Sequence, residues 1–248
     1  MDETSEVGAR FCGPPDSANG GYVCGLLAEH MASHGDAEVT LRRAVPLDRP
    51  LHVGRAPDGG AVLYDGDDVV AEAVPSMIDI VVPPAVSVDD ARRAAADSHV
   101  LREPGAHPFP TCFVCGPDRL PGDGMRLFAG PVANRDVVAA VWEPSPTLAR
   151  DDGDDRDGVV RREFVWAALD CPGSFSMDLE PRLDGPYVLG RLGAHVDAPV
   201  YVGAPYVVLG WRAGIDGRKL FAGSALYDAH GVPVAYARAT WVRLKPAA

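Results

Sequence analysis

The sequence lacks an excess of basic residues, a long apolar run and an apolar leader, and each absence excludes a class of protein. Among 248 residues, 23 are Lys or Arg and 35 are Asp or Glu, for a formal net charge of −12. A nucleic-acid partner is therefore not expected, because phosphate binding needs a basic surface. No apolar stretch approaches the roughly 18 residues that a membrane span requires. The acidic, polar start predicts no secretory signal.

Cysteine is also scarce, with five residues. An odd number without a secretory signal favours reduced thiols in a cytoplasmic protein over a disulfide framework. Cys112 and Cys115 have the spacing of half a zinc site, but a closed site needs four ligands and there is no second Cys-x-x-Cys. His107 and Cys171 would complete it only if the fold happened to bring them there. Buried thiols are the expected state, and neither a metal nor another cofactor is predicted.

Hydrophobic residues are abundant at 47%, enough for a full core. A helix followed by several strand-like runs, separated by Gly, Pro and Asp, predicts an α+β fold with an antiparallel sheet. This order occurs twice, with long helices expected at residues 22–33 and 159–171. The expected strands cover residues 38–45, 51–55, 61–64, 69–80, 136–142, 187–195, 206–213, 219–227 and 232–244.

A proline-rich segment, residues 83–110, separates the two sets of elements and contains one short expected helix at 88–96. It predicts an N-terminal half at residues 1–85, a linker at 86–110 and a C-terminal half at 111–248. Two pairs of similar segments favour an internal duplication. Residues 63–71 resemble 226–235, each reading as a hairpin with a polar turn, and residues 11–14 resemble 114–117.

The two long helices look like complementary halves of one site. Residues 18–28 read ANGGYVCGLLA and residues 161–170 read RREFVWAALD. In a gapless alignment the first copy keeps the glycines, while the second ends on Asp170 where the first has Ala28. Residues 164–169 are apolar on every side, which predicts a helix buried all round. We therefore expect a raised pKa for Asp170 beside the apolar Trp166.

A helix entered through a small polar residue and Gly-Gly, then followed by antiparallel strands, resembles the hotdog-fold acyl-CoA thioesterases. The resemblance covers most of the chain as two tandem copies and implies a double hotdog, with two central helices wrapped by antiparallel sheet. Asn19 stands where relatives of phenylacetyl-CoA thioesterase have His, and Asp170 stands at the place of the acid. The resemblance implies that backbone N–H groups of Gly20 and Gly21 polarise a thioester carbonyl while Asp170 activates water. Because Ala28 is no acid, at most one of two composite sites is expected.

Further candidates surround this expected site. Trp166 and Tyr22 would contact the substrate, and Ser174 could position water, although Pro172 is expected to break the helix before it. Glu29 or His30 could supply the acid–base group that the first half lacks. The basic residues available to phosphate groups of CoA are Arg42, Arg43, Arg49, Arg191, Arg212, Arg218 and Lys219. Among them, Arg191 and Arg212 are the two expected to contact the substrate.

Structural roles are the alternative for the central residues. Asn19 could simply cap its helix while Gly20 and Gly21 let it pack closely. Asp170 could accept hydrogen bonds from the backbone of residues 171–173. The acidic stretch 151–157 is expected to be solvated, because its register is not that of a calcium loop.

The predicted function is hydrolysis of acyl-CoA or acyl-carrier thioesters without a metal or redox cofactor. A hotdog hydratase or dehydratase acting on acyl-CoA ranks lower, because no Asp-x-x-x-x-His occurs at a helix entry. A third alternative is a non-catalytic protein that binds acyl ligands. Assembly into a homo-oligomer stays open.

Overall fold

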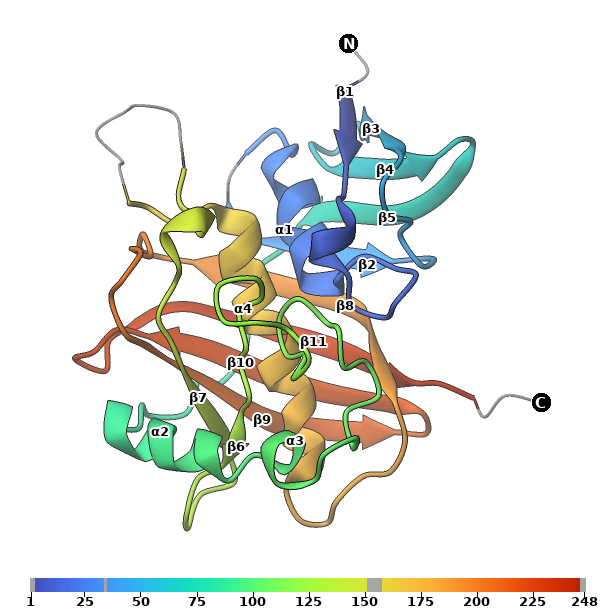
Figure 1. The fold of residues 1–248 in the computed structure, drawn as a ribbon. Helices are drawn as coiled ribbons and strands as arrows, with labels where there is room; N and C mark the ends of the chain where they lie inside the picture. The colour runs from blue at the N-terminus through green and yellow to red at the C-terminus, as the bar shows by residue number, and fades with distance from the viewer. Residues whose placement is uncertain (1–2, 34, 151–157, 246–248) are drawn as a thin grey trace.

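One antiparallel sheet forms the centre of the protein. The computed structural model describes residues 3–33, 35–150 and 158–245, and within them the sheet has 11 strands in the order β1-β3-β4-β5-β2-β8-β11-β10-β9-β7-β6 (Figure 1). The strands are β1 (Glu3–Glu6), β2 (Ala37–Leu41), β3 (Pro50–Arg55), β4 (Ala61–Asp65), β5 (Asp68–Pro75), β6 (Gly130–Pro131), β7 (Val138–Trp142), β8 (Tyr187–Val196), β9 (Tyr206–Asp216), β10 (Lys219–Tyr227) and β11 (Pro233–Arg243). The α-helices are α1 (Gly20–Glu29), α2 (Val88–Ala96), α3 (His99–Arg102) and α4 (Arg162–Ser174). The predicted α+β class is confirmed.

The order of strands is mirrored about the pair β2–β8. From this pair outward run β2, β5, β4 and β3 on one side and β8, β11, β10 and β9 on the other. In chain order, each set is one helix followed by four strands, α1 with β2 to β5 and α4 with β8 to β11. The two sets meet along a short register from Ala37 opposite Ala194 to Thr40 opposite Arg191. Both hairpins expected at residues 63–71 and 226–235 are present.

The helices α1 and α4 pack side by side on one face of the sheet (Figure 1). Every residue of α4 from Glu163 to Gly173 is buried, which confirms the all-round burial expected from the apolar run. Two glycines of α1 allow the contact. A Cβ atom at Gly21 would lie 2.4 Å from the Cβ of Asp170, and one at Gly25 would lie 2.5 Å from the Cα of Glu163. Only residues without side chains permit this approach.

The first part of the segment expected as a linker, which includes α2, covers the opposite face of the sheet. Ala91 and Ala94 of α2 pack in a second, smaller core with Val207 and Leu209 of β9, whereas Val208 between them belongs to the main core. Successive residues of a strand point to opposite faces, so β9 is buried on both sides. The expected helix at residues 88–96 is confirmed.

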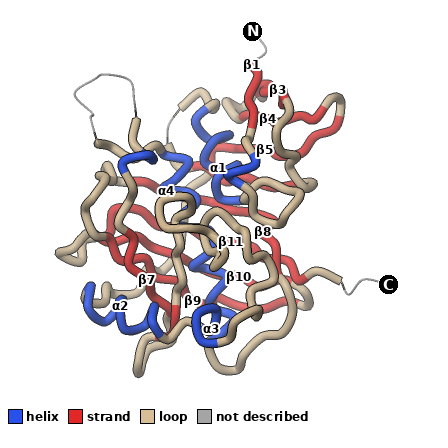
Figure 2. The backbone as a smooth tube through the Cα atoms, in the orientation of Figure 1, coloured by secondary structure: helices blue, strands red, loops and turns tan. Residues whose placement is uncertain are grey.

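Residues 125–128 form no strand, because the N–H groups of Met125 and Leu127 donate instead to the carbonyls of Phe113 and Val114 in a facing loop. Figure 2 shows that most of the chain from α3 to β7 is loop. The expected break of the helix at Pro172 is wrong, since α4 continues to Ser174. Only two residues follow this proline, so its missing N–H and its ring affect the last turn alone.

None of the helices in the described ranges is both long and apolar enough to cross a membrane. The acidic stretch 151–157, for which a solvated loop was expected, lies outside the described residues.

Candidate functional site

A cavity of about 960 Å³ lies where the start of α1 meets the end of α4. Its wall combines the turn at residues 13–20, the end of β2, the loop at 106–109, the last turns of α4 and the start of β8. Asn19, Gly20 and Asp170 all contribute to the wall. The residues singled out in the two helices therefore meet in one hollow.

Asn19 joins the two helices through both ends of its side-chain amide. Its Oδ1 accepts a hydrogen bond from the N–H of Tyr22 at 2.9 Å, the geometry of a helix N-cap. Its Nδ2 donates to Oδ2 of Asp170 at 3.1 Å. The N–H of Gly21 donates to the same oxygen at 2.9 Å. Asp170 Oδ2 is thus fixed by two donors from the start of α1.

The other oxygen of this carboxyl has no such donors. Asp170 is 1% exposed, and its buried Oδ1 has no hydrogen-bond partner among the described residues. Burial raises the pKa of Asp170 to about 7, against the opposing effect of the Gly21 hydrogen bond. The expected direction of this pKa shift is confirmed.

The two glycines of the helix entry differ in their surroundings. The Gly21 N–H already donates to Asp170, so it does not meet the expectation of a donor left for a substrate carbonyl. Gly21 is also required for close packing of α1 on α4, as the structural alternative proposed. Gly20 is half-buried and lines the cavity, and its N–H has no hydrogen-bond acceptor among the described residues. The Gly20 N–H is therefore the backbone donor at the start of α1 that is left for a substrate carbonyl.

Two aromatic residues expected at the substrate are absent from the described cavity wall. Tyr22 stacks on Phe11 with ring centroids 4.4 Å apart, inside an aromatic cluster. Trp166 is fully buried and lies against Gly25 in the helix interface. Both residues thus have packing roles in the structure, because apolar character alone does not distinguish a cavity wall from a packed helix interface. Ser174 does line the cavity, and its hydroxyl donates to the Cys171 carbonyl at 2.8 Å.

The two arginines predicted to contact substrate bind parts of the protein outside the described cavity wall. Arg212 donates to backbone carbonyls of residues 176–181, including that of Leu179 at 2.7 Å. Arg191 donates to Thr40 Oγ1 at 3.1 Å and pairs with Glu38 at 3.3 Å. The arginines at the cavity are Arg42, Arg43 and Arg182. Sequence reasoning missed Arg182, because no motif marks the loop after α4.

The remaining acid–base candidates lie away from the site. Glu29 lines no part of the cavity and pairs with Arg150 at 3.5 Å and Arg162 at 3.4 Å. His30 pairs with Glu3 at 3.1 Å. Glu29 is the last residue of α1 and His30 is its C-cap, at the opposite end of the helix from Asn19.

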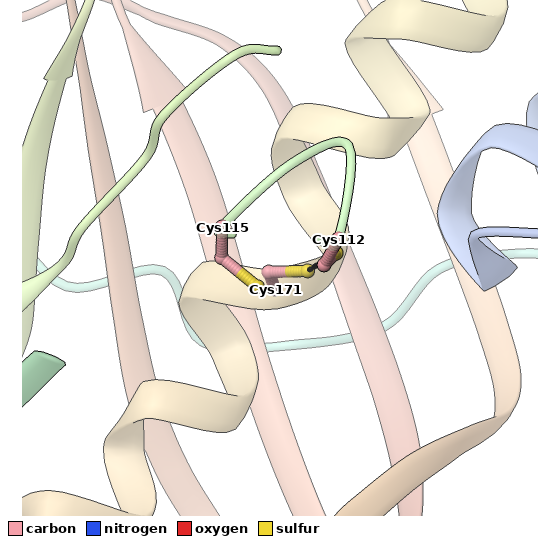
Figure 3. A group of neighbouring side chains, drawn as sticks. All are labelled: Cys112, Cys115 and Cys171. Carbon is pink, nitrogen blue, oxygen red and sulfur yellow. Dashed lines mark hydrogen bonds between the residues drawn. The ribbon is translucent and has the colours of Figure 1, made fainter. Parts of the chain in front are cut away.

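A cluster of thiols lies beside Asp170 in the same cavity wall. The sulfur atoms of Cys112, Cys115 and Cys171 are within 4.8 Å of one another, and all three residues are buried (Figure 3). His107 Nε2 lies 3.2 Å from the sulfur of Cys115. The fold therefore brings His107 and Cys171 next to Cys112 and Cys115, although the sequence gave no reason to expect this. Hydrogen bonds from the Cys115 and Cys171 thiols lower the pKa of Cys112 well below its usual range.

Comparison with known proteins identifies the fold. No family model matches the sequence, and a search of curated proteins finds no match. Among solved structures, the chain is similar to a conserved protein of unknown function with a hot dog fold from Alicyclobacillus acidocaldarius, with a TM-score of 0.62, 11% identity, and coverage of 98% of this chain and 93% of that one. It is also similar to a tesB protein from Mycobacterium avium subs paratuberculosis (TM-score 0.59, 11% identity, 98% and 92% covered). An acyl-CoA thioesterase II, TesB2, from Mycobacterium marinum gives a TM-score of 0.53 at 10% identity, with 86% and 81% covered.

The chain thus has the α+β hotdog fold, and the resemblance seen in the sequence is confirmed at that level. Activity has to be argued from the site itself, because one fold supports many functions.

Proposed function

We propose that this protein is a tandem double hotdog that hydrolyses acyl-CoA or acyl-carrier thioesters in the cavity beside Asp170. The observation that carries the proposal is that the two oxygens of this carboxyl have different surroundings. One oxygen is fixed by Asn19 and Gly21, while Oδ1 is buried without a partner at a large cavity. A buried oxygen without a partner is costly, so its persistence suits a group that binds water or substrate. The mirrored strand order supports the tandem arrangement and the boundaries 1–85, 86–110 and 111–248.

In the proposed reaction, Asp170 Oδ1 accepts a proton from water as the water oxygen bonds to the thioester carbon. The carbonyl oxygen becomes an oxyanion and accepts a hydrogen bond from the Gly20 N–H at the positive end of α1. When the carbon–sulfur bond breaks, the leaving thiolate takes the proton from Asp170. The products are a free acid and a thiol.

The cavity suits a substrate with an apolar body and an anionic end. Val23, Leu41 and Phe109 are apolar parts of the wall, whereas Arg42 and Arg43 lie at its exposed side, where they pair with Glu72 and Asp68. Arginine binds phosphate groups well, as CoA or a phosphopantetheine carrier would require. The five cysteines form no disulfide, which suits a reducing, cytoplasmic setting.

The test is release of thiol from a panel of acyl-CoAs by wild type and Asp170→Asn. The neutral amide can keep its oxygen toward Asn19 and Gly21 and place its NH₂ where Oδ1 was, so the fold should persist. We expect thiol release to fall by roughly 10²–10⁴-fold, the usual loss for a general base. Asp16→Asn makes the same chemical change at an exposed residue of the cavity rim and should retain activity.

Full activity of folded Asp170→Asn would contradict the proposal. A change in enoyl absorbance without free thiol would indicate a hydratase instead. Stabilisation by acyl-CoA with neither reaction would indicate a binding protein.

A further inference from the structure

The loop that covers the cavity presents two thiols in a tight turn. The Gly116 N–H donates to the Cys112 carbonyl at 2.8 Å, which closes the Cys-x-x-Cys segment into one turn. A Cβ atom at Gly116 would lie 2.5 Å from the carbonyl oxygens of both Pro110 and Cys112, so this turn requires glycine. Cys112 and Cys115 consequently point to the same side of the loop, toward α4 (Figure 3).

The helix supplies the third thiol and the preceding loop supplies an imidazole. The Cys171 sulfur lies 3.9 Å from that of Cys112, and His107 Nε2 lies 3.2 Å from the Cys115 sulfur. Neighbouring ligand atoms around a tetrahedral zinc ion with one nitrogen and three sulfur ligands are separated by roughly 3.5–3.8 Å, given bonds of about 2.3 Å to sulfur and 2.0 Å to nitrogen. The three sulfur atoms are therefore near the separations that such an ion needs, and the His107 ring reaches this cluster through Cys115.

We propose that Cys112, Cys115, Cys171 and His107 form a structural zinc site that fastens the loop at residues 107–116 to helix α4. Soft thiolates select zinc over hard ions such as magnesium or calcium. Four protein ligands fill a tetrahedral coordination sphere, so the ion has no open position for a substrate. The cavity that borders all four residues provides the path by which the ion enters.

Binding of the metal changes the protonation of its ligands. The three thiols lose their protons to solvent as the sulfur–zinc bonds form. In the metal-free geometry His107 Nδ1 accepts the Phe109 N–H at 3.0 Å, so a neutral ring carries its proton on Nε2. Coordination through Nε2 moves that proton to Nδ1 and gives up the Phe109 hydrogen bond. His107 is therefore the weakest of the four ligands.

The zinc site and the acid share a supporting residue. Asn19 Nδ2, which donates to Asp170, also lies 3.8 Å from the Cys112 sulfur and 3.9 Å from that of Cys171. Amide donors next to metal-bound thiolates are typical outer-shell groups that hold the ligands in place. The proposed ion would thus fix the end of α4 one residue beyond Asp170, whether or not the protein is a hydrolase.

The test begins with full-length wild-type protein purified under reducing conditions from zinc-supplemented medium. We expect one zinc ion per chain by elemental analysis. After removal of the metal, titration with Co²⁺ should give a sulfur-to-cobalt charge-transfer band and the intense visible bands of tetrahedral cobalt. Metal-depleted protein should melt at a lower temperature and recover on addition of zinc.

Variants of the proposed ligands are compared with a variant of a buried cysteine that lies outside the cluster. Cys171→Ser should lose the zinc and the cobalt charge-transfer band. Cys12→Ser should retain both, because Cys12 is equally buried and contacts Thr111 but stands outside the cluster. His107→Ala should keep a charge-transfer band, bind cobalt more weakly and show altered visible bands.

Should Cys171→Ser not fold, alkylation of the wild type decides the matter. Zinc should protect the three cluster cysteines from iodoacetamide, as mapped by mass spectrometry. Wild type that holds no zinc and gives no cobalt charge-transfer band would overturn the proposal. A Cys112–Cys171 disulfide in the reduced preparation, or undiminished zinc in folded Cys171→Ser, would also overturn it. Unchanged cobalt spectra in His107→Ala would exclude histidine as the fourth ligand.

Discussion

The two ends of the α1–α4 pair are related in sequence but have opposite chemistry. At one end, the tip of α1 offers Asn19 and two glycines to the carboxyl of Asp170 beside a large cavity. At the other, α4 begins with Arg161, Arg162 and Glu163, and the last turn of α1 carries Ala28 where α4 carries its acid. The same packing of two helices thus accommodates a shared carboxyl at one end only.

Ion pairs occupy the second end. Glu29 pairs with Arg150 and Arg162, and Arg161 pairs with Glu163 at 3.3 Å. Charged side chains at this position pair with one another, with only Glu163 among them buried, whereas Asp170 is held inside the protein by a backbone amide and a side-chain amide. The difference indicates that an acid at a buried helix end needs donors from the opposite tip, and the substitutions below test that requirement.

The largest effect is expected from giving the second end the acid of the first. Ala28→Asp places a carboxylate at a position that is 5% exposed, adjacent to Glu29 and without the glycine tip that holds Asp170. We expect the free energy of unfolding to fall by about 3 kcal/mol or more, the cost of an uncompensated buried charge. Urea denaturation measures it, with Ala28→Asn as the control for size. Equal stability of the two variants at neutral pH would show that the second end also accepts an acid.

The next largest effect is expected where the helices approach most closely. Gly21→Ala puts a Cβ atom 2.4 Å from the Cβ of Asp170 and 2.9 Å from the Trp166 carbonyl oxygen. We expect a loss of about 1–3 kcal/mol in unfolding free energy from overpacking. Gly20→Ala is the control, because the nearest atoms to its Cβ, at 2.8–3.0 Å, belong to the side chains of Leu189 and Leu41 and not to the facing helix. If both variants unfold at the same urea concentration, close packing does not explain Gly21.

A smaller effect should distinguish the two N-caps. Asn19 caps α1 through Tyr22 and donates to Asp170, whereas the side chain of Arg161 makes no cap hydrogen bond to α4. We expect Asn19→Ala to cost about 1–2 kcal/mol in thermal or urea unfolding. Arg161→Ala should cost less than about 1 kcal/mol, mainly from its contact over the Phe164 ring. A reversed order would mean that the ionic end is the more stabilising one.

The smallest effect is expected from the ion pairs themselves. Glu29→Gln removes the charge that faces Arg150 and Arg162 in partly exposed pairs. The loss in unfolding free energy should be less than about 1 kcal/mol and should shrink in high salt. Thiol release should stay unchanged, since Glu29 lies outside the cavity wall. A larger loss that salt does not diminish would assign Glu29 a role beyond these pairs.

Local patterns predicted much of this molecule correctly. The alternating strands and the apolar run at residues 164–169 gave the antiparallel sheet and the buried helix, because burial leaves a periodic trace in the chain. The alignment of the two helices also brought out Asn19, Gly21 and Asp170, which the structure joins by hydrogen bonds.

Sequence patterns do not settle positions that only tertiary packing decides. Trp166 and Tyr22 are as apolar as true cavity residues, but they face the helix interface and an aromatic cluster. His107 and Cys171 are 64 positions apart in the printed sequence, and no spacing rule relates an isolated histidine to a cysteine on a distant helix.

The short β2–β8 register has a consequence for how the molecule matures. Asn19 emerges from the ribosome 151 residues before Asp170, and the strand that joins the two sets of elements follows later still. Until β8 is synthesised and paired, the tip of α1 has no carboxyl to hold, since such distant contacts close late in folding. The contact between Asn19 and Asp170 is consequently expected to form only late in synthesis.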